Sequence, residues 1–501
     1  MLYNQRFSLL SGAMFVIVVF SIFLIVKSEY AYQLIEDASV TIRFYFGRYY
    51  LAIGFLSVIA IVLMAILPTG TIKLGTSEEK PEYSRLEWIA MLYSAGMGAG
   101  ILLRAVQEPV YMKMHPPVVS TAAPKVTALS YVFYHWGFTA WAFYALFAAI
   151  LSYYIYKYKA PIVISTAFTE AVTLLKRQRI IKPTFWLIDL LCILTTVIGL
   201  VAAVGLGTTQ ITGGISYLTG SPVSLYKTIF VIILISIIAG ISALIGVNKG
   251  IKIISKYNIY CTLVLLFFVF VQSDRIAILY DFFKALYHYL SHFLFFSLAI
   301  GDYNPGEAFL TDWTYYYWAF WLAWAPFTGI FIARISKGRT LRELVLGVLL
   351  IPSLGTFMWF TVFGNAAFQS IEMLTTYDGR FDDVFTSIFV FFSQFPFQTF
   401  INCITILLLL SFLVTSLDSA IFVLSMFTDK GNEQPHKKHR LLWSIALALL
   451  TIGVVSLGAA KEDSNVLIAM QKLLIVTSLP FSILLIIMIL LFIRSICKKK
   501  F

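Results

Sequence analysis

Residues 315–327 read Tyr315-Tyr316-Tyr317-Trp318-Ala319-Phe320-Trp321-Leu322-Ala323-Trp324-Ala325-Pro326-Phe327, inside a segment apolar enough to cross a bilayer. The tryptophans recur every three residues, away from the span ends where interfacial tryptophans lie. This spacing predicts that Trp318, Trp321 and Trp324 share one helix face at membrane depth. Such a row of rings favours a cation that donates no hydrogen bonds, for example a quaternary ammonium group, because ring quadrupoles replace its weak hydration.

A second aromatic segment can supply the facing wall. It reads Tyr134-His135-Trp136-Gly137-Phe138-Thr139-Ala140-Trp141-Ala142-Phe143-Tyr144. Trp141 and Tyr144 are three residues apart and share a face, and Trp136 lies within a wide arc of that face. Together with Trp321, these rings can enclose one onium head. The alternative is that they are packing or lipid-facing aromatics in a phenylalanine-rich protein.

The composition is that of an all-α polytopic membrane protein. Of 501 residues, 60% are hydrophobic and 12% are charged, whereas charged residues make up about 25% of soluble proteins. Apolar stretches of roughly 20 residues indicate about twelve transmembrane helices. We predict them at 9–27, 49–68, 87–111, 127–156, 186–214, 225–247, 255–273, 311–336, 341–368, 398–427, 440–459 and 467–493.

The loop charges predict the orientation in the membrane. Loops after even-numbered spans carry about 20 Lys and Arg residues, against about 8 after odd-numbered spans, so both termini should be cytoplasmic. The net charge of +12 sits in these loops and in the tail, which favours contact with anionic membrane lipids over nucleic acid. The first apolar stretch is too long for a signal-peptide core and should be retained.

Two spans carry interruptions that a plain lipid-facing helix avoids. The third contains Gly96-Met97-Gly98-Ala99-Gly100, and the eighth contains Pro326 and Gly329. They are five spans apart, as expected if spans 3–7 and 8–12 form a 5+5 inverted repeat after two extra N-terminal spans. The alternative is that the glycines only allow close helix packing. We therefore divide one membrane domain into 1–85, a first repeat 86–273, an external connection 274–310 with an amphipathic interfacial helix, a second repeat 311–495 and a short tail 496–501.

The tenth span contains an oxygen-rich segment, Phe412-Leu413-Val414-Thr415-Ser416-Leu417-Asp418-Ser419. Hydroxyl oxygens beside backbone carbonyls of a broken helix suit a sodium ion. The hydroxyls can instead bond back to their own helix. Asp418 is expected to be functional or paired, because a bare carboxylate at that depth costs several kcal/mol.

These segments together resemble the betaine/choline/carnitine transporters. The resemblance extends over roughly 50–495, and its most specific part is the eighth span, from Trp313 through Pro326-Phe327 to Ala333-Arg334-Ile335-Ser336-Lys337-Gly338-Arg339-Thr340-Leu341-Arg342-Glu343. The other matching segments are Gly96 to Gly100 with Glu108-Pro109, the Trp136, Trp141 and Tyr144 set, Gly205-Leu206-Gly207 with Gln210-Ile211, and Val414 to Ser419.

The resemblance implies the fold of the amino-acid/sodium symporters, a homotrimer and a set of site residues. Trp136, Trp141, Tyr144 and Trp321 match the aromatic box, Trp324 the path to the cytoplasm, and Met97 and Phe320 further contacts with substrate. A sodium site is implied at Thr415 and Ser416 with carbonyls of Ser94, Met97 and Phe412. The family's second sodium site matches Thr196 and Phe327. Gly96, Gly98, Gly100, Glu108 and Asp418 have supporting roles.

Three departures bear on substrate and coupling. Leu200 stands where the second sodium site has a threonine, and a leucine offers no oxygen, so we expect one coupling sodium. Arg104 stands where the family usually has an aromatic residue. It either forms an i,i+4 pair with Glu108 or meets the carboxylate of a zwitterion, which would favour betaine over choline. Phe320 replaces a common tryptophan.

The sequence thus predicts a secondary transporter of a bacterial inner membrane that imports a quaternary ammonium compound with sodium. Glycine betaine is the first candidate, and choline or carnitine come next. The chain should not be an enzyme, and sodium is the only expected ion, with no cofactor. Sodium-independent or proton-coupled transport, exchange, and an onium receptor that does not transport are the alternatives.

Overall fold

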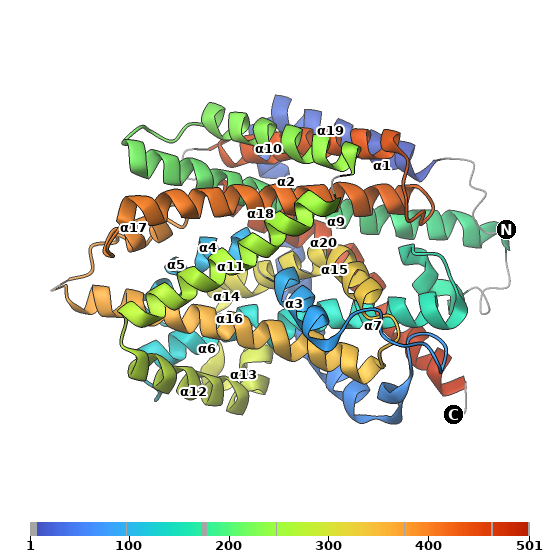
Figure 1. The fold of residues 1–501 in the computed structure, drawn as a ribbon, viewed down its shortest axis with the longest axis horizontal. Coiled ribbons are helices and arrows are strands. Elements are labelled where there is room, and N and C mark those ends of the chain that lie inside the picture. Colours follow the sequence, from blue (N-terminus) through green and yellow to red (C-terminus); the bar gives the residue numbers. More distant parts are fainter. Residues whose placement is uncertain are drawn as a thin grey trace.

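The computed structural model describes residues 8–96, 98–171, 178–246, 248–374, 376–461 and 464–498. These residues form a bundle of helices (Figure 1). The elements are α1 (Leu9–Val26), α2 (Ser28–Ile66), η1 (Pro68–Thr71), α3 (Arg85–Gly96), α4 (Ala99–Arg104), α5 (Gln107–Met114), α6 (Pro124–Trp136), α7 (Phe138–Tyr158), η2 (Ile164–Phe168), α9 (Gln178–Thr219), α10 (Leu225–Ile245), α11 (Asn248–Gln272), α12 (Arg275–Ser291), α13 (Phe293–Leu298), η3 (Gly301–Tyr303), α14 (Glu307–Phe309), η4 (Leu310–Tyr315), α15 (Tyr316–Ile335), α16 (Leu341–Glu372), α17 (Ser387–Phe392), α18 (Gln398–Thr428), α19 (Lys437–Gly458) and α20 (Val466–Lys498).

Among the described residues, eleven helical segments are long and apolar enough to cross a membrane. They coincide with eleven of the predicted spans, and the chain is therefore an all-α, multi-pass membrane protein. The span predicted at 87–111 is divided into α3, α4 and α5, as the glycine stretch predicts. The pairing of spans into inverted repeats stays a prediction.

The second span is much longer than predicted. We expected it to begin at residue 49, but α2 begins at Ser28 and runs for 39 residues, or about 58 Å. That is about twice the thickness of a bilayer core. Its charged first half contains no Gly or Pro. Glu36 forms ion pairs with Arg43, at 3.5 Å, and with Lys472. Because these charges are paired along the helix surface, nothing interrupts it.

The eighth span is not broken where its sequence predicts. α15 stays helical from Tyr316 to Ile335 with Pro326 inside it, and the irregular part is the π-helical turn η4 before it. Gly329 instead allows close packing, because a Cβ there would lie 2.5 Å from the ring of Phe147 in α7. Likewise, a Cβ at Gly199 of α9 would lie 2.9 Å from that of Ala323. Small residues thus bring α7, α9 and α15 together at the centre.

The amphipathic segment predicted at 276–299 forms two helices, α12 and α13. α12 packs on α6 and α16, and Asp274 caps its first turn by accepting from the N–H groups of Ile276 and Ala277. His288 is buried and forms a 3.1 Å hydrogen bond with the Ser130 hydroxyl. The opposite face of α12 exposes large apolar side chains.

Residues 337–339, at the end of the segment that most resembles the family, connect two loops by hydrogen bonds and an ion pair. The N–H of Gly338 donates to the Leu74 carbonyl at 2.7 Å, and the N–H of Leu74 donates to the Arg339 carbonyl at 2.8 Å. Lys337 pairs with Glu79 at 2.6 Å. That hydrogen bond lowers the pKa of Glu79 and raises the pKa of Lys337. The loops after the second and eighth spans are therefore locked together.

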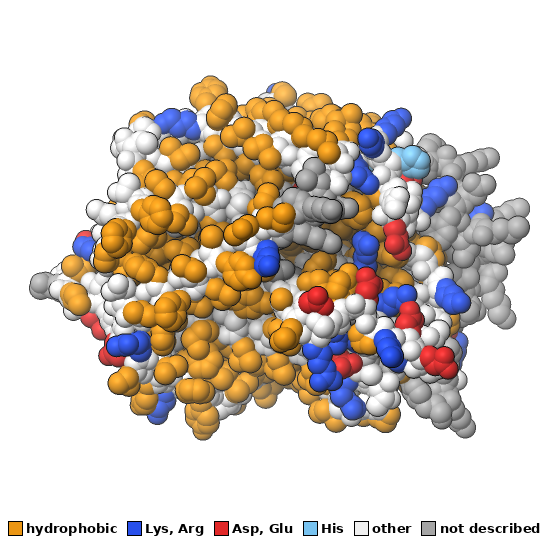
Figure 2. Space-filling view, in the orientation of Figure 1, with side chains coloured by type: hydrophobic (Ala, Val, Ile, Leu, Met, Phe, Trp, Pro, Cys, Tyr) orange, Lys and Arg blue, Asp and Glu red, His pale blue; other side chains and the backbone are white. Residues whose placement is uncertain are grey.

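The surface has the pattern expected for a bilayer protein. Hydrophobic side chains cover most of the face in Figure 2, while charged side chains lie mainly toward the two ends of the bundle, most densely toward the right-hand end. The start of α1 and the end of α20 lie toward that same end in Figure 1. A chain that crosses the membrane an even number of times, as the twelve predicted spans would, has both ends on the same side.

Candidate functional site

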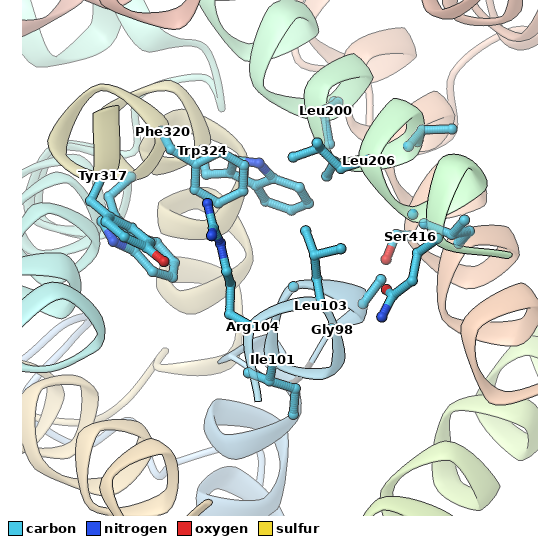
Figure 3. A pocket seen from close by; sticks show the side chains of 18 of the residues that line it. Gly98, Ile101, Leu103, Arg104, Leu200, Leu206, Tyr317, Phe320, Trp324 and Ser416 are labelled. Carbon is cyan, nitrogen blue, oxygen red and sulfur yellow. The ribbon is translucent and has the colours of Figure 1, made fainter. Parts of the chain in front are cut away.

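A cavity of about 100 Å³ lies among the central helices. Its walls come from α4, α9, α15 and α18, with Trp136 from the end of α6 and Tyr144 from α7. In Figure 3, Tyr317, Phe320 and Trp324 lie on one side of it, and Leu200, Leu206 and Ser416 lie on the other. The cavity is thus enclosed by segments far apart in the sequence.

The break in the third span opens the cavity. α3 ends at Gly96 and α4 begins at Ala99; Met97, predicted to contact both substrate and sodium, lies outside the described residues. Gly98 lines the cavity, and a Cβ there would meet nothing within 4 Å. Gly100 faces the box, because its Cβ would lie 3.4 Å from the indole of Trp136.

A second break, at Gly137, separates α6 from α7. A Cβ at Gly137 would lie 2.4 Å from the Phe133 carbonyl and from the ring of Phe357, so only glycine fits. The carbonyls before the break lose their helical partners. The indole N–H of Trp321 donates to the His135 carbonyl at 2.9 Å, and the Thr356 hydroxyl donates to the Trp136 carbonyl at 3.2 Å.

The break brings three of the four predicted box rings together. The ring centroids of Trp136 and Trp321 are 5.4 Å apart at an interplanar angle of 80°. Those of Tyr144 and Trp321 are 5.8 Å apart at 74°. Rings at these angles form adjoining walls, and all three line the cavity.

The polar edges of the cavity indoles are already bonded to protein. Trp136 donates to the Glu108 carboxylate at 3.0 Å, and Trp324 donates to the Gly199 carbonyl at 3.0 Å. Glu108 is fully buried and also accepts from the hydroxyl of Tyr317. Since Trp321 is bonded as well, a ligand meets ring surface and not free indole N–H groups.

Two predicted tryptophans lie outside the cavity wall. Trp141 packs edge-on against Tyr144, with centroids 5.3 Å apart, and supports it from behind. Trp318 packs against Tyr134 at 5.0 Å, and the expectation that it shares a face with Trp324 is wrong. Three residues fall about 60° short of a turn, so positions 318 and 324 differ by about 120°.

Arg104 lines the cavity without a direct ion pair to any described residue. Its side chain is 3% exposed, and in Figure 3 it extends toward the aromatic side. The guanidinium donates to the Gln107 side-chain carbonyl at 2.6 Å and lies 4.9 Å from the ring centroid of Trp313. Its guanidinium forms no direct ion pair with a carboxylate of a described residue, but Glu108 is near enough to interact with it electrostatically. The chain turns between α4 and α5, so the two residues do not share a helix.

A second cavity, of about 230 Å³, adjoins the first. Gly98, Trp324 and Ser416 line both. Phe412, Thr415 and Phe327, all predicted to contact sodium, line the second. The Thr415 hydroxyl donates to the Ser411 carbonyl at 2.9 Å and to the Phe412 carbonyl at 3.1 Å. A hydroxyl that donates back to its helix still has lone pairs to offer a cation.

Thr196 and Asp418 line neither cavity. Thr196 donates to the Cys192 carbonyl at 2.8 Å within its own helix. Asp418 faces Ser242 and Arg440, on the side of α18 that packs against α10 and α19. Ser94 lies in the last turn of α3. Phe327 lines the second cavity and Thr196 does not, and the second sodium site that the resemblance implies at these residues stays a prediction.

Tyr317 is a cavity residue that the sequence analysis missed. It donates to Glu108 and lies 5.6 Å, centroid to centroid, from Trp136. A signal was present: positions 317, 321 and 324 follow the i, i+4, i+7 spacing of a single helix face. The prediction was based instead on the tryptophans at every third position, Trp318, Trp321 and Trp324, and therefore did not include Tyr317.

The fold and cavity define a multi-pass membrane protein with an aromatic, ligand-sized chamber between broken helices. The family profile described as "BCCT, betaine/carnitine/choline family transporter" matches residues 8–501. The chain belongs to this family. Its members are named as transporters, and the prediction that the chain is not an enzyme is confirmed.

Relatives in the family are named for several substrates. "Glycine betaine transporter OpuD" of Bacillus subtilis (strain 168) is 34% identical over 93% of this chain and 89% of its own length. "Ectoine/hydroxyectoine transporter" of Virgibacillus pantothenticus is 31% identical over 91% and 89%. "High-affinity choline transport protein" of Escherichia coli (strain K12) is 34% identical over 87% and 64%.

Proposed function

We propose that this protein imports a quaternary ammonium compound together with sodium. Glycine betaine is the first candidate, and carnitine and choline follow. The observation that carries the proposal is a cavity in which ring surfaces from two spans adjoin a buried arginine that forms no direct ion pair with a described residue. The substrates in the names of the relatives support the same chemical class.

The rings would hold the onium head. A trimethylammonium group cannot donate hydrogen bonds, and each desolvated ring face contributes about 0.5–2 kcal/mol. The indole N–H groups of Trp136, Trp321 and Trp324 already donate to protein acceptors. They are therefore not free to bind water in the cavity, and the onium head meets the ring faces. Phe320 and Tyr144 would complete the apolar surround.

Arg104 would receive the carboxylate. A buried charge without a direct ion pair is costly, and a zwitterion bound with its anionic end at Arg104 would neutralise it. Choline offers no such group and would add a second positive charge to the cavity. The proposal therefore ranks betaine above choline.

Sodium would be the second cargo. Thr415 and Ser416, with carbonyls of Phe412, Ser94 and Met97, offer the hard oxygen ligands that sodium prefers. Gly98 and Ser416 border both cavities, so cation and substrate would stabilise the same arrangement of the third and tenth spans. Transport would follow by alternating access around this site.

The cellular setting is inferred from the same pattern. We place the protein in a bacterial inner membrane with cytoplasmic termini, following the loop charges. We also propose a homotrimer surrounded by membrane lipids, as the family resemblance implies.

Uptake measurements test the proposal. Cells lacking betaine uptake and expressing this chain should accumulate radiolabelled glycine betaine when sodium is present and lose most uptake when potassium replaces it. Equal uptake in both media would overturn sodium coupling. Betaine binding to the purified protein without uptake would favour a receptor.

The Arg104→Gln variant tests the zwitterion preference separately. We expect betaine affinity to fall by about tenfold or more, since a hydrogen bond to a charged group contributes about 1.5–3 kcal/mol, while choline affinity stays or improves. Unchanged betaine affinity would remove Arg104 from the site.

A further inference from the structure

Gln210 is a polar cavity residue to which the proposed function gives no role. It lies in α9, shortly after the Gly205-Leu206-Gly207 segment, and lines the same cavity as Trp136 and Arg104. Its side chain is fully buried at 0% exposure. Neither its Oε1 nor its Nε2 has a hydrogen-bond partner among the described residues.

The neighbouring polar side chains of α9 do not share this condition. The hydroxyls of Thr208 and Thr209 donate to the Gly205 carbonyl at 3.0 and 2.8 Å, and the Thr212 hydroxyl donates to the Thr209 carbonyl at 2.9 Å. Buried polar groups in proteins nearly always have partners. A buried amide with both atoms free, on a cavity wall, is therefore placed to bond something that enters the cavity.

Helix geometry places Gln210 at the same end of the cavity as Arg104. α9 and α15 pack against each other and run in opposite directions, being the fifth and eighth spans. They touch where Trp324 donates to the Gly199 carbonyl. Gln210 lies eleven residues after Gly199 and Trp313 eleven before Trp324, so each is about 16 Å from that contact, toward the same end. The Arg104 guanidinium lies over Trp313.

We propose that the Gln210 amide is a second contact for the anionic end of the substrate and selects for carboxylates. The Nε2 group donates to a carboxylate oxygen while Arg104 donates to the same group from α4. The rings of Trp136, Tyr144 and Trp321 then hold the onium head. The ligand class is a short zwitterion with a quaternary ammonium and a carboxylate. This inference rests on the proposed function.

Calorimetric titration of the purified protein with two ligands tests the inference. Glycine betaine carries both ends, whereas tetramethylammonium carries the head alone. Gln210→Met keeps the length of the side chain but removes both polar atoms. We expect it to weaken betaine binding by about tenfold or more, as for loss of a hydrogen bond to a charged group, and to change tetramethylammonium binding by less than about threefold.

A second variant makes the result independent of packing losses. Gln210→Glu has nearly the same shape but places a negative charge against the carboxylate. We expect betaine binding to fall by more than in Gln210→Met, and tetramethylammonium binding to stay equal or strengthen. The matched control is Asn365→Leu, because Asn365 is a buried amide whose Nδ2 donates to the Thr361 carbonyl outside the cavity. It should leave the ratio of the two affinities unchanged.

The possible outcomes separate this inference from the proposed function. If the Gln210 variants weaken both ligands equally, or neither, Gln210 is not a contact of the anionic end and the inference is wrong, while the aromatic site stands. If the unmodified protein binds neither ligand, the proposed function fails and the role of Gln210 fails with it.

Discussion

The indole N–H of Trp321 donates a 2.9 Å hydrogen bond to the backbone carbonyl of His135, which the break at Gly137 leaves without a helical partner. This bond joins the fourth and eighth spans at the aromatic box. It satisfies a buried carbonyl and fixes the orientation of the ring in one step. The irregular backbone of one span therefore positions the binding surface of the other.

The Trp321→Phe variant should separate the ring from its N–H group. The variant keeps an aromatic face but leaves the His135 carbonyl unbonded, and a buried group in that condition costs about 1–3 kcal/mol. We expect betaine affinity to fall by about tenfold, measured by equilibrium binding of radiolabelled betaine. Trp318→Phe is the control: it should lower the melting temperature by loss of packing against Tyr134 and leave affinity within about threefold. Equal losses of affinity in both variants would contradict the role of the N–H group.

The glycines at the two breaks should respond differently to alanine. Gly137→Ala places a Cβ 2.4 Å from backbone and ring atoms, and overpacking of this kind costs about 1–3 kcal/mol. We expect a lower melting temperature and reduced uptake. In Gly98→Ala, the added Cβ meets nothing within 4 Å, so the melting temperature should hold while uptake falls, because the methyl group enters both cavities. A thermally destabilised Gly98→Ala protein would show that this break is tightly packed.

The hydroxyl of Thr415 should matter for sodium and not for the fold. In Thr415→Ala, we expect the sodium concentration for half-maximal uptake to rise by about tenfold, as for loss of one charged contact, with near-normal betaine affinity at saturating sodium. Thr405→Ala on the same helix is the control. Its hydroxyl donates to the Ile401 carbonyl at 2.9 Å and lines neither cavity. A similar sodium shift in both variants would place the effect in the helix and not at the ion.

One sodium per substrate should move one net charge with a zwitterion. Leu200 lines the aromatic cavity with an apolar side chain, and Thr196 bonds to its own helix. One inward charge gains about 2.3 kcal/mol per 100 mV, which supports roughly fifty-fold accumulation from voltage alone. Simultaneous current and flux measurements in proteoliposomes should give a charge-to-betaine ratio of one. A ratio of two would require a second sodium site elsewhere.

The regular parts of the fold could be predicted from the sequence because hydrophobic runs of membrane length have few alternative structures. The break between Gly96 and Gly100 was also predictable, since three glycines at alternate positions weaken a helix. The long N-terminal extension of α2 could not be predicted, because its charged residues are typical of a loop between membrane spans. In the structure they lie along a continuous helix, where Glu36 pairs with Arg43 and also with Lys472, a partner more than 400 residues away.

The site was predictable in composition and less so in geometry. The spacing of Trp136, Tyr144 and Trp321 indicated a shared volume, and these rings do adjoin one another. Trp141 and Tyr144 both lie in α7, whereas Trp136 lies before the break, so the direction of Trp136 relative to them depends on the turn at Gly137. Predicting from sequence spacing which residues share a helix face assumes one unbroken helix, so the prediction fails for residues on the two sides of such a turn.

The three indoles of the cavity also give the protein an optical property. Trp136, Trp321 and Trp324 line the chamber, whereas Trp141, Trp318, Trp359 and Trp443 are sealed in the interior. Indole emission depends on the charge and polarity beside the ring, so the arrival of a permanent cation perturbs the first group and leaves the second as an internal reference. The tryptophan fluorescence of the unlabelled protein should therefore report whether the cavity is occupied.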